Sequence, residues 1–113
     1  MAVDIHKLFN EKLPEGLAKN REAALQIGSS FQFRIFGEGG GDWFVDTSGG
    51  DPKCYSGNPG RPDCTITISA EDFQKFLENP QANGMQLFFS QKMKIEGDQR
   101  LTMSLTKLFA LRG

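Results

Sequence analysis

Histidine and cysteine, two side chains often used for acid–base and nucleophilic chemistry, are scarce in this chain, which has one histidine and two cysteines. Its single histidine, His6, lies among charged residues near the N-terminus, and a catalytic histidine needs a partner group and a pocket. Cys64 could act as a nucleophile if neighbouring groups lowered the pKa of its thiol, but His6 is distant in sequence. We interpret His6 as a surface imidazole and Cys64 as an inert buried thiol on a strand.

Three carboxylates, Asp63, Glu71 and Asp72, could form a general acid and base if one of them were buried. Their positions at the edge of a predicted strand and in the first turn of a predicted helix favour a structural role, because a helix N-terminus stabilises negative charge. The chain has no P-loop, no Gly-x-Ser-x-Gly and no His-Glu-x-x-His motif. We therefore predict no catalytic residues, no cofactor and no enzymatic activity.

The only two cysteines, Cys54 and Cys64, are not arranged as a metal site. Neither a Cys-x-x-Cys pair nor a Cys/His ligand spacing is present, so we predict no bound metal. The two residues could pair across a hairpin or remain reduced. We favour two reduced thiols.

The charge of the chain argues against nucleic-acid binding. It has 13 basic and 14 acidic residues and a net charge of -1, whereas a protein that binds a phosphate backbone has a clustered basic excess. Residues 91–113 are locally richer in Lys and Arg than in Asp and Glu. Two interpretations remain open, transient contact with an anionic membrane and a solvated surface with a cation-rich helix end. The second is favoured, because no long run of like charges occurs.

We expect a soluble, cytoplasmic protein. No apolar signal region begins the sequence, and no apolar run approaches the roughly 18 residues that span a membrane. A chain of 113 residues is predicted to form a single domain, residues 1–113.

Apolar periodicity predicts helices near the N-terminus and a run of strands after them. An amphipathic helix is expected over residues 4–13, where Pro14 should interrupt it, and a second helix should follow Asn20 as its N-cap and end at Gly28. Alternating patterns then predict five strands. These cover residues 31–35, 43–46, 53–57, 64–68 and 92–96.

Further helices are predicted around the last two strands. Ser69 and Asp72 have capping-box spacing at the start of one helix, and Asn79-Pro80 should end it. A short helix over residues 82–90 and a final helix over residues 101–109 follow, the latter capped by Asp98. The strands are joined by short connections, and each has one apolar and one polar face. These features indicate an α+β fold with a five-stranded, mainly antiparallel sheet and helices covering one face.

Ten phenylalanines give the chain a large apolar content. Two interpretations of these side chains are open. They could fill a dense core, or they could line a chamber. An empty chamber of lipid size, about 300 Å³, would cost about 7 kcal/mol, similar to the net stability of a whole domain. A chamber would therefore be occupied, or its helices would collapse when the ligand leaves.

Seven segments form a recognisable set of motifs. They are Asp63 to Ile68, Asp72-Phe73, Asn79-Pro80, Phe88-Phe89, Lys92 to Asp98, Gly40 to Asp46, and the closing helix from Leu101 to Phe109. Together they resemble the sterol carrier protein type 2 family of lipid-binding domains. The resemblance covers nearly the full chain and is weakest over residues 1–28.

The resemblance implies an apolar tunnel between sheet and helices and intracellular lipid binding and transfer. The ligand would be a fatty acid, fatty acyl-CoA, isoprenoid or sterol-like lipid, and partner enzymes of lipid metabolism are expected. As an alternative, the chain would be a non-catalytic accessory subunit that presents an apolar substrate to enzymes of lipid or quinone biosynthesis. The tunnel wall is predicted to consist of Phe33, Ile35, Trp43, Ile66, Phe73, Phe76, Leu77, Met85, Phe88, Phe89, Met93, Leu105 and Phe109.

Overall fold

Five strands form one mixed sheet in the computed structural model, which describes residues 3–111. The spatial order is β3-β2-β1-β4-β5. The pairs β1–β2, β2–β3 and β4–β5 are antiparallel and β1–β4 is parallel, so the predicted mainly antiparallel sheet is confirmed. The strands are β1 (Ser30–Phe36), β2 (Gly41–Asp46), β3 (Lys53–Ser56), β4 (Cys64–Ser69) and β5 (Met93–Gly97).

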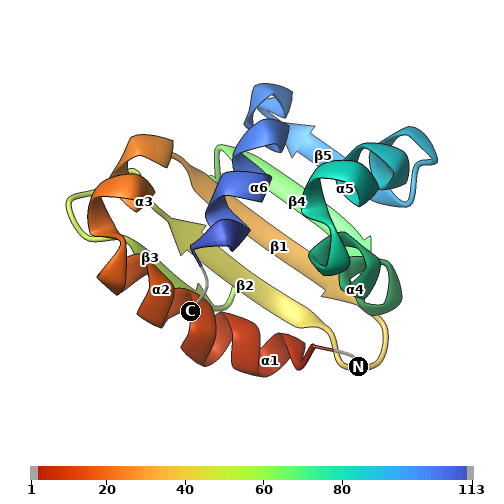
Figure 1. Ribbon diagram of the computed structural model, residues 1–113, viewed down its shortest axis with the longest axis horizontal. Coiled ribbons are helices and arrows are strands. Elements are labelled where there is room, and N and C mark those ends of the chain that lie inside the picture. The colour runs from red at the N-terminus through yellow and green to blue at the C-terminus, as the bar shows by residue number, and fades with distance from the viewer. Residues whose placement is uncertain (1–2, 112–113) are drawn as a thin grey trace.

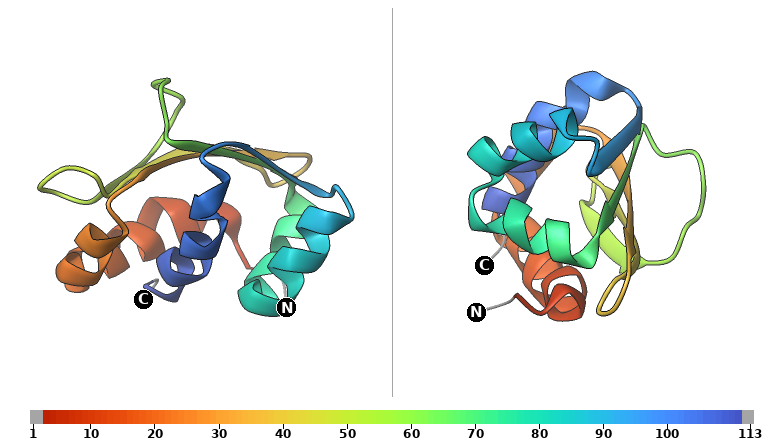
Figure 2. Two further views of the ribbon diagram at one scale, coloured as in Figure 1. Left: turned by 90° about the horizontal axis from the view of Figure 1, so that it is seen from above. Right: turned by 90° about the vertical axis from the view of Figure 1, so that its right-hand side faces the viewer.

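The parallel pair arises because the chain leaves the edge strand β3, crosses the sheet and re-enters it beside β1. Residues 57–63 make this crossing on the open face, where the loop stands away from the helices (Figure 2). Asp63 and Ser30 fix the register at the start of the two strands. The Ser30 amide donates to Asp63 Oδ2 at 2.9 Å, and the Asp63 amide donates to Ser30 Oγ at 2.9 Å.

All helices lie on the other face of the sheet, as predicted (Figures 1 and 2). Within the described residues, no helix is both long and apolar enough to cross a membrane. The elements are α1 (Ile5–Lys7), the π-helical η1 (Leu8–Lys12), α2 (Leu13–Lys19), α3 (Arg21–Ile27), α4 (Ala70–Glu78), α5 (Pro80–Phe89), the 3₁₀ turn η2 (Gln99–Leu101) and α6 (Thr102–Ala110).

Pro14 does not interrupt the first helix, so that prediction is wrong. The helix continues from Ile5 to Lys19 through the π turn, in which the Leu13 amide donates to the carbonyl of Leu8. In the same pattern the donor to the Phe9 carbonyl would be residue 14, but proline has no N–H. The thiol of Cys54 on β3 donates to this carbonyl instead, with Sγ and O 3.2 Å apart. The irregular turn is therefore tied to the edge of the sheet.

Most of the predicted helix ends are confirmed. Asp4 caps α1 and Ser69 caps α4, each accepting a backbone N–H from three residues on. Gly28 ends α3 in the left-handed conformation, with φ of 59°. Asn20 and Asp98 are exceptions. The Asn20 side chain donates to the carbonyl of Gly16 at the end of α2 and does not cap α3. Asp98 accepts the amide of Arg100 in η2 and does not cap α6, whose N-cap is Leu101.

Cys54 and Cys64 are both free thiols, as favoured from the sequence. They lie on β3 and β4, which β2 and β1 separate. At a strand spacing of about 4.8 Å the two strands are about 14 Å apart, too far for a disulfide. Burial raises the pKa of the Cys54 thiol to about 12 and is the main cause of the rise in the pKa of Cys64 to about 11.

Candidate functional site

Six aromatic side chains meet between the sheet and the helices. We call them the aromatic cluster, and each is at most 3% exposed. They come from η1, from the central strand β1 and its neighbour β2, from α4 and from α6. The members are Phe9, Phe33, Trp43, Phe73, Phe76 and Phe109.

Phe9 and Phe109 hold the cluster together. Phe9 stacks on Trp43 with ring centroids 4.6 Å apart, and it also contacts Phe33, Phe73 and Phe109. The ring of Phe109 meets those of Phe33, Phe73 and Phe76 edge-on at 5.5 to 5.6 Å. Rings from η1, β1, β2, α4 and α6 thus form one continuous contact.

The helix α6 lies over the middle of the helix layer (Figure 1). Its backbone approaches those of α3 and α5, and it approaches the strands much less closely. By contrast, η1, α2, α4 and α5 lie close to strands of the sheet. Seen from above, α6 lies below the curved sheet, between the N-terminal helices α1 to α3 and the α4–α5 pair (Figure 2). Large side chains, among them Leu105 and Phe109, therefore fill the space between α6 and the sheet.

The polar edge of the cluster lies at Trp43. Its indole N–H donates to Asn10 Oδ1 at 3.0 Å. The exposed ring of His6 stands edge-on against the indole with centroids 5.0 Å apart, and His6 Nε2 lies 3.0 Å from the carbonyl oxygen of Gly40. His6 is a surface residue, as expected, and it covers one side of Trp43.

Most of the predicted tunnel residues are buried in one apolar core. Phe88 is partly buried against that core. Whether any of these side chains contacts a ligand stays a prediction. The fully buried ones are Phe33, Ile35, Trp43, Ile66, Phe73, Phe76, Leu77, Met93, Leu105 and Phe109.

Met85 and Phe89 are not in the core, and the expectation that they face the interior is wrong. They are 59% and 72% exposed. Gly84 and Leu87 are the buried positions of α5, and a Cβ on Gly84 would lie 3.2 Å from the ring of Phe76. This close approach fixes the rotation of α5, which turns Met85 and Phe89 outward.

Phe9 was not among the predicted tunnel residues, although it is fully buried at the centre of the cluster. The amphipathic pattern of the first helix places Phe9 on the apolar side with Leu8 and Leu13. The pattern could not show that Phe9 reaches Trp43, because that contact joins two residues far apart in the sequence.

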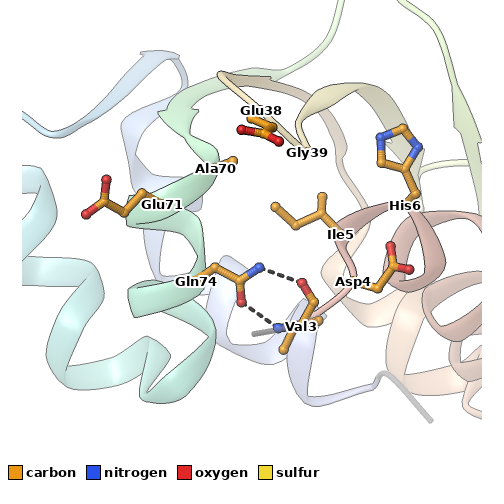
Figure 3. A pocket seen from close by; sticks show the side chains of 9 residues that line it. All are labelled: Val3, Asp4, Ile5, His6, Glu38, Gly39, Ala70, Glu71 and Gln74. Carbon is orange, nitrogen blue, oxygen red and sulfur yellow. Dashed lines mark hydrogen bonds between the residues drawn. The ribbon is translucent and has the colours of Figure 1, made fainter. Parts of the chain in front are cut away.

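A first surface pocket, of about 360 Å³, lies between the N-terminal segment and α4 (Figure 3). The side chain of Gln74 closes one end of the pocket. Its amide oxygen accepts the N–H of Val3, and its amide nitrogen donates to the carbonyl of Val3. The carboxylates of Asp4, Glu38 and Glu71 stand around the opening.

A second surface pocket, of about 340 Å³, separates α4 from α5 and is lined mainly by polar side chains, with Leu87 among them. Neither this pocket nor the first is lined by a predicted tunnel residue.

The three carboxylates considered for chemistry occupy separate places. The Asp63 carboxylate accepts the Ser30 amide, and Glu71 lies at the rim of the first pocket. Asp72 forms a long ion pair with Lys75 at 3.9 Å. Asp63 therefore ties two strands together, and Asp72 lies in the first turn of α4 where negative charge is favoured.

Comparison with known sequences gives one family match and several relatives. Residues 9–110 match the model of a family described as the SCP-2 sterol transfer family. Hydroxysteroid dehydrogenase-like protein 2 of Rattus norvegicus is 37% identical over 79 residues, which are 69% of this chain and 15% of that protein. Sterol carrier protein 2 of Homo sapiens is 31% identical over 107 residues, covering 92% of this chain and 19% of that protein. The chain thus spans about a fifth or less of the length of these relatives.

Solved structures share the fold. Sterol carrier protein 2 from Yarrowia lipolytica in its apo form has a TM-score of 0.74 at 21% identity, covering 90% of this chain and 87% of that one. Sterol carrier protein 2 from Aedes aegypti in complex with palmitate has a TM-score of 0.71 at 19% identity, with full coverage of both chains. A ubiquinone synthesis protein, UbiJ-SCP2, has a TM-score of 0.64 at 20% identity, covering 95% of this chain and 90% of that one.

Proposed function

Because this chain belongs to the SCP-2 sterol transfer family, we propose that it binds one acyl chain, or a similar apolar lipid, between α6 and the sheet and carries it to an acceptor. The observation that carries this proposal is the position of α6. Its backbone stands farther from the strands than those of η1, α2, α4 and α5, and the intervening space holds apolar side chains, among them Leu105 and Phe109.

The rings of the aromatic cluster occupy the space that the lipid would take. In this arrangement the protein avoids the cost of an empty cavity. A ligand would enter by displacing Phe109 with α6, so the contacts of Phe109 with Phe33, Phe73 and Phe76 would open together. The helices η1, α2, α4 and α5, whose backbones approach the sheet more closely, would stay in place.

Burial of the acyl chain of the ligand supplies the driving force for binding in this proposal. At about 0.8 kcal/mol for each methylene, a sixteen-carbon chain gives a gross gain of about 12 kcal/mol. The loss of ring contacts and the ordinary costs of association reduce that figure. The family match and the palmitate complex of the fold neighbour from Aedes aegypti support a long-chain fatty acid or its ester as the first ligand to test.

The test is displacement of a fluorescent fatty acid from delipidated protein, with native mass spectrometry for stoichiometry. We expect one palmitate for each chain at micromolar concentration. A matched variant, Leu105→Trp, adds bulk at a fully buried position of α6 and should weaken binding while circular dichroism shows that it is folded. Absence of binding by wild-type protein to palmitate, palmitoyl-CoA and an isoprenoid alcohol would overturn the proposal.

A second candidate function is a non-catalytic subunit that presents an apolar substrate to enzymes of lipid or quinone biosynthesis. The fold likeness to a ubiquinone synthesis protein favours it. Affinity capture from the native host should then recover a stable enzyme complex, and the same complex should form with Leu105→Trp. If the complex formed only with lipid-loaded wild-type protein, the carrier role would be the better description.

A further inference from the structure

The strand β5 forms one edge of the sheet (Figure 1). It pairs with β4 on its inner side, and among residues 3–111 no strand pairs with its outer side. An uncovered strand edge presents backbone N–H and C=O groups that can pair with another chain. The direction of these groups and the charges on β5 indicate which chain fits here.

The backbone groups of Ile95 point to the outer side of β5. The Asp98 amide, which follows the strand, donates to the carbonyl of Asp63 at 2.9 Å. Because backbone groups alternate in direction along a strand, those of Glu96 also face β4 and those of Ile95 face the opposite way. The Nε2 of Gln99 lies 3.5 Å from the Ile95 carbonyl oxygen, which is long for a hydrogen bond. A second chain can therefore reach this carbonyl.

The open face of β5 carries one cation and one anion. Lys94 and Glu96 are exposed, and they alternate with Met93 and Ile95, which are buried on the helix side. Within one chain Lys94 Nζ and Glu96 Oε1 lie 3.8 Å apart. Edge strands often carry charges that repel an approaching edge. Here the two opposite charges lie on either side of Ile95, so the edge is complementary to a copy of itself.

We propose that β5 pairs with β5 of a second copy of the chain, in antiparallel orientation, about a two-fold axis at Ile95. The two Ile95 residues are then opposite each other and exchange N–H···O bonds, because the backbone groups of both face outward. Lys94 of each copy lies opposite Glu96 of the other. These opposed positions are the closely spaced pairs of the new ladder, with Cα atoms about 4.5 Å apart.

The charges select this register over its neighbours. An axis at Lys94 would place two lysines opposite each other, and an axis at Glu96 would place two glutamates opposite each other. Like charges directly opposite on paired strands are destabilising, whereas opposite charges are stabilising. A two-fold axis also makes the same surface of both copies meet, as in most soluble dimers.

The helix α5 provides apolar side chains near the proposed junction. The two-fold axis leaves the helices of both copies on one face of a continuous sheet, and the backbone of α5 approaches β5. Phe89 and Met85 on α5 are 72% and 59% exposed. Contact between the two α5 helices would add apolar burial to a strand interface that is small by itself.

The test is sedimentation equilibrium of the full, delipidated chain. Wild-type protein should form a dimer that salt weakens. Lys94→Glu places glutamates opposite each other at both ends of the junction and should raise the dissociation constant of the dimer about tenfold or more. Glu96→Lys should do the same with lysines. The double variant Lys94→Glu/Glu96→Lys should dimerise as wild type does, because opposite charges face each other again.

A matched control is Lys19→Glu on α2. Lys19 is 67% exposed and pairs with Glu15, much as Lys94 is 73% exposed and pairs with Glu96. This variant should dimerise as wild type does. Amide hydrogen exchange tests the register. The Ile95 amide should be protected in wild-type protein and exchange faster in Lys94→Glu, whereas the Glu96 amide, which faces β4, should be protected in both.

Any of four results would overturn the inference. Wild-type protein could stay monomeric at millimolar concentration, or its dimer could be unaffected by Lys94→Glu. The double variant could remain as weakly associated as the single ones. The Ile95 amide could exchange freely in the dimer. Dimerisation and the proposed lipid binding are tested separately, because Lys94 and Glu96 lie on the face of the sheet opposite the proposed lipid space.

Discussion

The ring of Phe9 lies flat against the indole of Trp43, with centroids 4.6 Å apart and an interplanar angle of 10°. This contact joins the first helix to the sheet at the centre of the aromatic cluster. Trp43 is the only tryptophan of the chain, so its emission reports on this one location.

A lipid that enters between the layers should therefore change the fluorescence of Trp43. Palmitate should change the wavelength or the intensity of the Trp43 emission, and the change should be complete when one equivalent is bound. A fatty acid brominated on its chain should quench it. The same acid should quench the Trp43 emission little in Leu105→Trp. The emission of the new tryptophan at position 105 is measured in Trp43→Phe/Leu105→Trp and subtracted. Unchanged emission at saturating palmitate would place the ligand away from the cluster.

Phe109→Ala should destabilise the ligand-free protein by about 3 to 5 kcal/mol, because it removes a fully buried ring. Palmitate should then raise the melting temperature of this variant more than that of wild type, since the ligand no longer displaces the ring and binds more tightly. Leu17→Ala is the matched control, because Leu17 is fully buried on α2 and outside the cluster. It should be destabilised without a larger ligand effect, and equal shifts in the two variants would argue against a site at Phe109.

Cys54 should contribute to stability through its bond to the Phe9 carbonyl. Cys54→Ala leaves that carbonyl without the thiol donor and should cost about 1 kcal/mol beyond the loss of side-chain volume. Cys54→Ser keeps a donor of similar size and should cost less. Urea denaturation of the three proteins measures the difference, and equal stability of the alanine and serine variants would show that the bond contributes nothing.

The same residue predicts a loss of stability in alkali. Its pKa is raised from the usual 9.0 to about 12 in the folded protein, so between these values the unfolded thiol loses its proton while the folded one keeps it. The thiol's contribution is therefore complete below about pH 9 and falls as the pH rises toward 12. Wild type should lose more stability than Cys54→Ser between pH 9 and 11, and parallel pH profiles would contradict this.

Gly97 should be hard to replace. Its φ is 92°, and a Cβ there would lie 2.5 Å from the carbonyl oxygen of Asp63. Gly97→Ala should therefore destabilise the protein by more than about 2 kcal/mol, from backbone strain together with the clash. Gly49→Ala, where a Cβ meets nothing within 4 Å, should be nearly neutral. Thermal unfolding compares them.

The strands and most helix ends could be predicted because each depends on local signals. Alternation at Cys64 to Ile68 and the cap at Ser69 are visible in a few adjacent residues, and both are present in the structure. The parallel pairing of β1 with β4 could not be predicted in this way. It depends on the contact between Ser30 and Asp63, which are far apart in sequence.

Most residues of the candidate site could be predicted from the sequence, but their arrangement in space was predicted less well. Periodicity identified the buried rings of Phe33, Phe73 and Phe109, because apolar spacing marks the inner side of an element. It failed for Met85 and Phe89, since the rotation of α5 is set by the approach of Gly84 to Phe76. It placed Phe9 on the apolar side of the first helix but could not reveal its contact with Trp43, which is distant in sequence.

The most direct test of the account uses the complex with carbon-13-labelled palmitate. Isotope-edited nuclear Overhauser spectra should show contacts from the acyl chain to the rings of Phe33 and Phe109 and to Trp43. Contacts confined to the exposed side chains of Met85, Phe89 and Met103, with none to the buried rings, would contradict a lipid site between α6 and the sheet.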